Sequence, residues 1–162
     1  MLLKCLHKCN HVLDTIYMAL GVILLVVLIG ASTAQVLTRY VLNSSLIGTE
    51  ELARYCFIWM SLLGGAICVG KWAHSSVSIL SDLLPQKGKD FLFILINLLI
   101  VVCALIFLSG GMEMVQTAGS QLSPSLRIPK KFVYLSVPVG GFGMLLHSIE
   151  HMIRTLGKLF GK

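Results

Sequence analysis

The stretch 49–74, TEELARYCFIWMSLLGGAICVGKWAH, is apolar enough to enter a lipid bilayer, yet it carries charges near its start. Glu50 and Glu51 open the stretch, and Arg54 follows about one helical turn further in. An ionised side chain at membrane depth is costly unless it is paired. Both carboxylates precede Arg54 at helical spacing, so either one shares its face and can neutralise it. We therefore expect a helix that supplies its own counter-charge.

Thr49 is a residue type that often caps the start of a helix. Glu50 and Glu51 then fall in the first turn, near the positive end of the helix dipole. Two interpretations follow from this arrangement. The cluster either only caps and neutralises the helix start, or it also faces a partner subunit or a proton path.

Composition places the whole chain in a membrane. Of the 162 residues, 56% are hydrophobic and only 12% are charged, and the mean hydropathy is +0.88. The apolar runs predict an all-α integral membrane fold with four transmembrane helices, at about 12–37, 50–73, 90–116 and 131–153. The prediction is one membrane domain over 1–162. Little chain remains for a soluble catalytic domain, and no glycine-rich phosphate loop is present.

The basic residues predict the orientation. With both termini in the cytoplasm, the inner segments hold Lys4, Lys8, Lys71, Lys87, Lys89, Arg154, Lys158 and Lys162, and the outer loops hold Arg39, Arg127, Lys130 and Lys131. This excess favours cytoplasmic termini. The outer run RIPKK at 127–131 opposes the rule, which suggests an outer partner for it. The net charge of +6 reflects these span ends, so we expect no nucleic-acid partner.

Two segments outside the spans have the pattern of short amphipathic helices on the membrane surface. They are the N-terminal segment 1–11 and the loop segment at about 75–84, which Pro85 terminates. The run CLHKCNH at 5–11 alternates cysteine and histidine, which is a possible zinc pattern. On a helix, however, the two cysteines and the two histidines lie on different faces, so we expect no metal and no cofactor.

Small residues in two of the spans indicate close helix packing. Gly64 and Gly65 occur in the second span, and Pro138, Gly140 and Gly141 occur in the fourth. Glycine lets another helix approach closely, and proline at membrane depth can also kink a helix. Close contact with a partner is the simpler interpretation.

Other polar residues leave alternative functions open. His74, His147 and His151 could ligate haem in a membrane anchor of a redox complex. A small proton-coupled exporter would need a carboxylate well inside the first span, whereas Asp14 lies at its edge. Glu113 falls at the outer end of the third span, where headgroup exposure is the simpler reading. No catalytic arrangement of side chains shares a face, so we expect no enzyme.

The stretch 49–74 and its continuation HSSVSI resemble the signature of the small membrane subunit of tripartite ATP-independent periplasmic (TRAP) transporters, the DctQ-like family. The residues that carry the resemblance are Glu50, Glu51, Leu52, Ala53, Arg54, Phe57, Ile58, Trp59, Gly64, Gly65, Ala66, Lys71 and His74. The later run SPSLRIPKKFVYLSVPVGGFGM also resembles the outer loop and fourth helix of the family. The chain departs from the pattern at Ile47 and Gly48, where an aromatic residue is usual, and at Lys71, where arginine is more usual.

The resemblance implies a scaffold role in the inner membrane of a bacterium. Such transporters import organic acids, including C4-dicarboxylates, 2-oxo acids and sialic acids, with a sodium gradient. A periplasmic substrate-binding protein delivers the substrate to a large, elevator-like membrane subunit. The small subunit would brace that subunit in the bilayer, with the interface or structural residues Glu50, Glu51, Arg54, Trp59, Gly64, Gly65, His74, Pro138, Gly140 and Gly141. Arg39, Arg127, Lys130 and Lys131 would help dock the binding protein.

Overall fold

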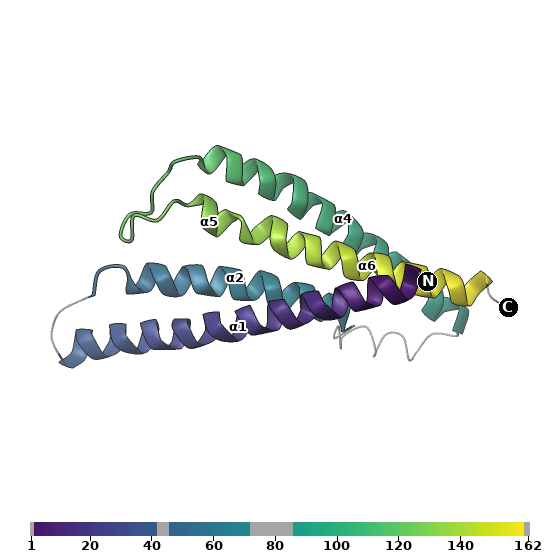
Figure 1. Cartoon of the computed structure of the whole chain (residues 1–162), viewed down its shortest axis with the longest axis horizontal. Coiled ribbons are helices and arrows are strands. Elements are labelled where there is room, and N and C mark those ends of the chain that lie inside the picture. The colour runs from purple at the N-terminus through teal and green to yellow at the C-terminus, as the bar shows by residue number, and fades with distance from the viewer. Residues whose placement is uncertain (1, 42–45, 72–85, 161–162) are drawn as a thin grey trace.

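A computed structural model describes residues 2–41, 46–71 and 86–160, which form an antiparallel bundle of long helices (Figure 1). The elements are α1 (Leu2–Val41), α2 (Thr49–Gly70), α4 (Gln86–Ala118), the short α5 (Lys131–Tyr134) and α6 (Ser136–Phe160). Both termini lie at one end of the bundle. The end of α1, the start of α2 and the loop from α4 to α5 lie at the other end.

Four helical stretches are long and apolar enough to cross a membrane: Leu6–Val41, Thr49–Gly70, Phe91–Ala118 and Lys131–Thr155. The predicted four-span, all-helical fold is therefore confirmed. The N-terminal segment is not separate from the first span, because α1 runs without a break from Leu2 to Val41. The predicted surface helix at 75–84 and His74 lie outside the described residues.

The helices pack as two antiparallel pairs that meet along α2 and α6. α1 lies along α2, and α4 lies along α6, while α2 also contacts α6. A small core forms where they meet, around Tyr17, Leu63 and Ala66, which are at most 5% exposed. The Tyr17 hydroxyl donates a 2.7 Å hydrogen bond to the carbonyl oxygen of Val139. This bond joins α1 to α6 across the bundle.

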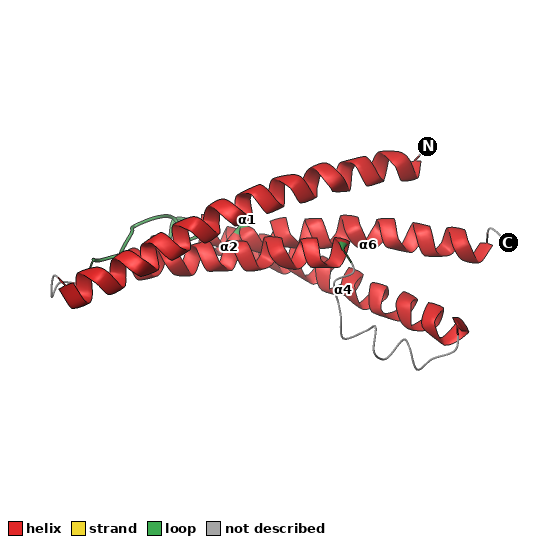
Figure 2. Cartoon of the chain, turned by 90° about the horizontal axis from the view of Figure 1, so that it is seen from below, coloured by secondary structure: helices red, strands yellow, loops and turns green. Residues whose placement is uncertain are grey.

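Most of the remaining surface is apolar. Val26 of α1 is 65% exposed, and Ile106 of α4 is 61% exposed. Figure 2 shows α1 and α4 as long helices that extend at the periphery of the bundle. Exposed apolar surface on helices of this length is covered by lipid or by another membrane protein.

Candidate docking loop and subunit interface

Arg54 pairs with Glu50 on the surface of α2. Its Nη2 atom donates a 2.9 Å hydrogen bond to Glu50 Oε1, and both side chains are largely exposed. The expectation of a local counter-charge for Arg54 is confirmed. Because the pair is exposed at the end of the span, it neutralises the helix start without cross-linking two elements.

Glu51 binds different partners from Glu50. Its Oε2 atom accepts hydrogen bonds from the backbone N–H groups of Ser125 and Leu126, each at 2.9 Å. Its Oε1 atom accepts a short hydrogen bond from the hydroxyl of Tyr55. Glu51 therefore ties the start of α2 to the loop that follows α4, a contact that the spacing to Arg54 does not reveal.

The predicted cap at Thr49 is wrong. The residue before the helix is Gly48, which has a left-handed backbone with φ of 98° and offers no side-chain cap. The Thr49 hydroxyl instead donates a 3.1 Å hydrogen bond back to the carbonyl oxygen of Leu46. A Cβ atom at position 48 would lie 2.8 Å from Leu126 Cδ2, so glycine here serves both the turn and the close approach of the loop.

The loop between α4 and α5 has internal order of its own. Leu122 and Pro129 form an isolated antiparallel bridge. The Ser123 N–H donates to the carbonyl oxygen of Ile128, and the Lys130 N–H donates to that of Gln121, both at 2.9 Å. We call residues 119–130 the outer hairpin. Ser123 is 2% exposed, so the base of this hairpin is anchored in the bundle.

The basic residues predicted to dock a partner gather around this hairpin. Arg127 is exposed at its tip, with a φ of 53° that is unusual for a residue with a side chain. Lys130 is half-buried, and exposed Lys131 places its ammonium group 5.5 Å from the centroid of the Phe132 ring. Arg39 is exposed in the last turn of α1, at the same end of the bundle.

A polar cleft of about 460 Å³ is lined by residues of the outer hairpin and of the ends of α1 and α2. Its lining includes Glu50, Glu51 and Arg54 on one side and Ser125 and Lys130 on the other. The acidic and basic groups of this end therefore share one hollow surface.

The other predicted interface residues pack within this chain to different degrees. The indole N–H of Trp59 donates a 3.1 Å hydrogen bond to the carbonyl oxygen of Phe132. Gly140 lies against Leu62 of α2, and Gly141 lies against Phe107 of α4. These contacts join α2, α4 and α6 at backbone distance, as small residues in membrane helices allow.

The remaining predicted small residues differ in what surrounds them. Pro138 is buried against Gly111 of α4, and Gly65 faces Met144. Gly64 has no neighbouring atom within 4 Å of where a Cβ would lie. Of these positions, Gly64 leaves room for a helix from outside the chain.

Sequence reasoning missed a polar cluster at the terminal end of the bundle. Glu150 of α6 is only 6% exposed. Its carboxylate accepts hydrogen bonds from Asn10 and Arg154, and His7 Nδ1 lies 3.0 Å from it. Glu150 and Arg154 are one helical turn apart, a signal that was present in the sequence, but Asn10 and His7 come from the far end of the chain.

A second buried pair extends this cluster. His147 Nε2 lies 3.0 Å from Asp14 Oδ1, close enough for an ion pair although the two groups are not aligned for a hydrogen bond. The ring of His147 also fills the space beside Gly70, the last residue of α2. These contacts join α1, α2 and α6 at the end that carries both termini.

Two of the histidines proposed as alternative haem ligands are already engaged, and the third, His74, lies outside the described residues. His147 faces Asp14, and His151 donates from Nε2 to the carbonyl oxygen of Gly70 at 3.1 Å. A haem ligand needs a free lone pair on its nitrogen, which this His151 tautomer does not offer at Nε2. Within the described residues, no group of three or more His, Cys, Asp or Glu side chains is placed to hold a metal ion.

Known proteins match the chain over most of its length. Residues 28–158 match the family model of the tripartite ATP-independent periplasmic transporters, DctQ component. The sialic acid TRAP transporter small permease protein SiaQ of Vibrio cholerae is 29% identical over 98% of this chain and 90% of its own length. The ectoine TRAP transporter small permease protein TeaB of Halomonas elongata is 28% identical over 91% of this chain and 74% of its own length.

A longer relative matches as well. The sialic acid TRAP transporter permease protein SiaT of Haemophilus influenzae is 30% identical over 81% of this chain, which spans only 21% of that protein. The family match covers the Glu50–Arg54 pair, the Glu51 anchor and the outer hairpin. The chain therefore belongs to the DctQ family, the small membrane component of tripartite ATP-independent periplasmic transporters.

Proposed function

We propose that this chain is the small permease subunit of a TRAP transporter that imports an organic acid with a sodium gradient. It braces the large membrane subunit and helps dock the periplasmic substrate-binding protein. The observation that supports docking most directly is the outer hairpin, which Glu51 holds by two backbone hydrogen bonds. A held loop binds at lower entropic cost than a free one.

The charge of the hairpin supports an acidic partner surface. Arg127 is exposed on the hairpin, Lys131 is exposed at the start of α5 directly after it, and Arg39 adds positive charge at the same end of the bundle. Basic groups on a rim speed the encounter with an acidic patch and make it sensitive to salt. This role requires the hairpin end to face the periplasm and both termini to face the cytoplasm, as the distribution of lysine and arginine predicts.

The helices support a bracing role better than a carrier role. A carrier site is usually formed by broken helices with polar groups at the middle of the membrane. Here α1, α2 and α4 are continuous, and the break between α5 and α6 falls at Leu135, near the end of its span. We infer that the substrate and sodium sites lie in the large membrane subunit and that this chain is not an enzyme.

The names of the relatives support an inference about the partner subunit of this chain and about the class of compound transported. SiaQ and TeaB are named as small permease proteins of a sialic acid and an ectoine transporter. SiaT is called a permease protein, and this chain corresponds to about a fifth of it. We infer that a large membrane subunit is the partner of this chain, and that the transported compound is a small organic acid.

Sodium-driven uptake into proteoliposomes tests this proposal. The large membrane subunit and the substrate-binding protein are reconstituted with and without this chain, after stable co-purification has been checked. We expect uptake only when the chain is present. Unchanged uptake without it, or the absence of a stable complex, would contradict the proposed function.

A further inference from the structure

Glu113 stands out among the acidic residues because it is exposed on a membrane-spanning helix without a counter-charge. It lies five residues before the end of the span Phe91–Ala118. Unlike Glu50, Glu51 and Glu150, it forms no hydrogen bond or ion pair with any other residue that the structure describes. Ionisable residues within transmembrane segments usually pair with another group, whereas from the sequence alone the position of Glu113 near the span end favours headgroup exposure.

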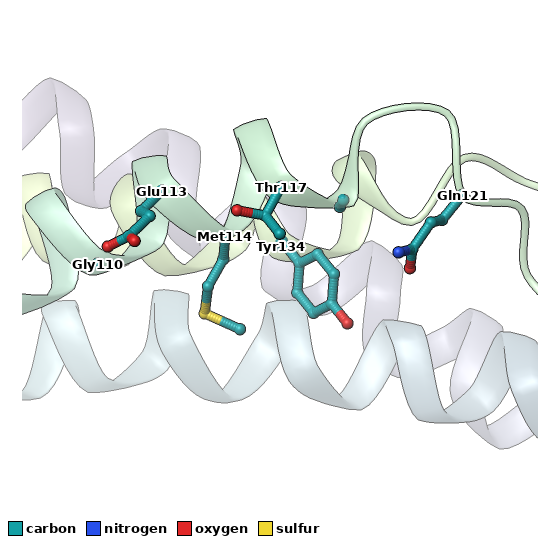
Figure 3. Close-up of a pocket in the computed structure, with 7 residues that line it drawn as sticks. Gly110, Glu113, Met114, Thr117, Gln121 and Tyr134 are labelled. Carbon is teal, nitrogen blue, oxygen red and sulfur yellow. The ribbon is translucent and has the colours of Figure 1, made fainter.

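The carboxylate belongs to a pocket rather than to a smooth helix face. A pocket of about 290 Å³ is lined by Gly110, Glu113, Met114, Thr117, Ala118, Gln121 and Tyr134 (Figure 3). Figure 3 shows Glu113, Met114 and Thr117 on α4, with Tyr134 contributed by α5 and Gln121 by the outer hairpin. The pocket thus combines one carboxylate with side chains that offer further oxygen acceptors. Its volume is roughly that of ten water molecules in the liquid, which suits one long side chain.

The surface leading to this pocket is open to a neighbouring helix. One turn before Glu113, Gly110 has no atom within 4 Å of where a Cβ would lie. Leu99 and Ile106, which precede Glu113 at helical spacing, are 60% and 61% exposed. A partner helix can therefore pack along this side of α4 and reach the carboxylate.

We propose that this pocket receives an arginine side chain of the large membrane subunit. The inference rests on the proposed function, which supplies that partner. A guanidinium group carries a fixed charge and five donors in a planar fork. It can pair with the Glu113 carboxylate and also donate to the hydroxyl oxygen of Thr117, which follows one helical turn later. A lipid ammonium group would satisfy the charge alone, whereas the mixed acceptor set and the open glycine favour a protein side chain.

The test measures association of this chain with the large membrane subunit in liposomes, using a fluorescence donor on one and an acceptor on the other. We expect Glu113→Gln to weaken association about tenfold, because it leaves the arginine without its counter-charge, and Glu113→Lys to weaken it further. Gln116→Lys is the control: this exposed residue lies outside the pocket, about one turn closer to the end of the span, and the variant should associate like the unaltered chain. The arginines of the large membrane subunit are changed to glutamate one at a time, and one of these changes should restore association of Glu113→Lys.

Several outcomes separate this inference from its rivals. Normal association of Glu113→Lys would overturn the inference alone, whereas failure of the unaltered chain to associate would overturn the proposed function as well. If the effect of Glu113→Gln disappears in vesicles of phosphatidylglycerol without phosphatidylethanolamine, a lipid amine occupies the pocket and the inference is wrong. Equal melting temperatures of the variants and the unaltered chain in detergent exclude misfolding as the cause.

Discussion

Glu50 and Glu51 show how adjacent identical residues acquire different roles. Successive residues on an α-helix point about 100° apart. Glu50 therefore shares its direction with Arg54, while Glu51 turns toward the outer hairpin and binds Ser125 and Leu126. The first carboxylate neutralises a charge on its own helix, and the second positions a distant loop.

Replacement of Glu51 by alanine should loosen the outer hairpin. The N–H groups of Ser125 and Leu126 would lose their acceptor, so their hydrogen exchange should become several-fold faster. Uptake that depends on the binding protein should fall in parallel, since the docking loop is no longer held. Hydrogen–deuterium exchange with peptide resolution measures the first effect.

The matched control for this change is Glu50→Ala. It removes an equally large acidic side chain, but its only described partner is Arg54, and exposed pairs of this kind contribute little. Exchange at Ser125 and Leu126 should stay at the level of the unaltered chain. Equal acceleration by both substitutions would show that Glu51 does not anchor the loop.

At the scale of whole helices, neighbouring glycines of α4 also differ. A Cβ at position 111 would lie 2.6 Å from Pro138 Cδ and 2.9 Å from its backbone nitrogen, whereas position 110 is open. The contact at Gly111 lets α4 and α6 meet at backbone distance. Pro138 is the third residue of α6 and follows the break at Leu135, so it lies in the first turn, where its missing N–H leaves no helix hydrogen bond unmade.

Substitution of Gly111 by alanine should therefore destabilise the pairing of α4 and α6. Overpacking of a close contact costs about 1–3 kcal/mol. Gly110→Ala is the natural control, because alanine meets nothing there and favours the helix by about 1 kcal/mol. Melting temperatures of the isolated chain in detergent should fall for the first variant only. If Gly110→Ala lowered the melting temperature by the same amount, Gly111 would not be the site of the close contact between α4 and α6.

The polar cluster at the terminal end makes a second prediction about helix pairing. Glu150→Ala should lower the free energy of unfolding by about 1–3 kcal/mol, because the buried Asn10 amide and the exposed Arg154 guanidinium lose a charged acceptor. The loss should appear as a lower melting temperature and as greater protease sensitivity of the start of α1. Unchanged melting would mean that Glu150 does not contribute to holding α1 in the bundle.

At the scale of the whole molecule, the chain has two ends of different character. As a DctQ family member with four apolar helices, it is a multi-pass protein of the bacterial inner membrane. One end holds the termini and the buried cluster around Glu150. The other holds the outer hairpin, the exposed basic residues and the polar cleft. The first end joins helices, and the second is open to a partner.

Reversal of the charges at Arg127, Lys130 and Lys131 tests the docking role of that open end. If they steer an acidic patch of the binding protein, the change to glutamate should reduce uptake at low salt and weaken its dependence on ionic strength. The corresponding glutamine variant should show an intermediate loss. The membrane topology of each variant is checked by placing a single cysteine in the hairpin and labelling it with a reagent added on the outer side of the membrane. Unchanged uptake and salt dependence would exclude steering by these residues.

The sequence by itself determined the class of fold, the approximate spans, the local pairing of Arg54 and the family resemblance. Each of these depends on composition or on residues within a few helical turns, which periodicity reports directly. The rest required the tertiary structure. The cap at Gly48, the attachment of Glu51 to the outer hairpin and the partners of Glu150 join segments that are far apart in the chain. Such contacts depend on how each helix is rotated in the bundle, and a pattern along one helix does not specify that rotation relative to its neighbours.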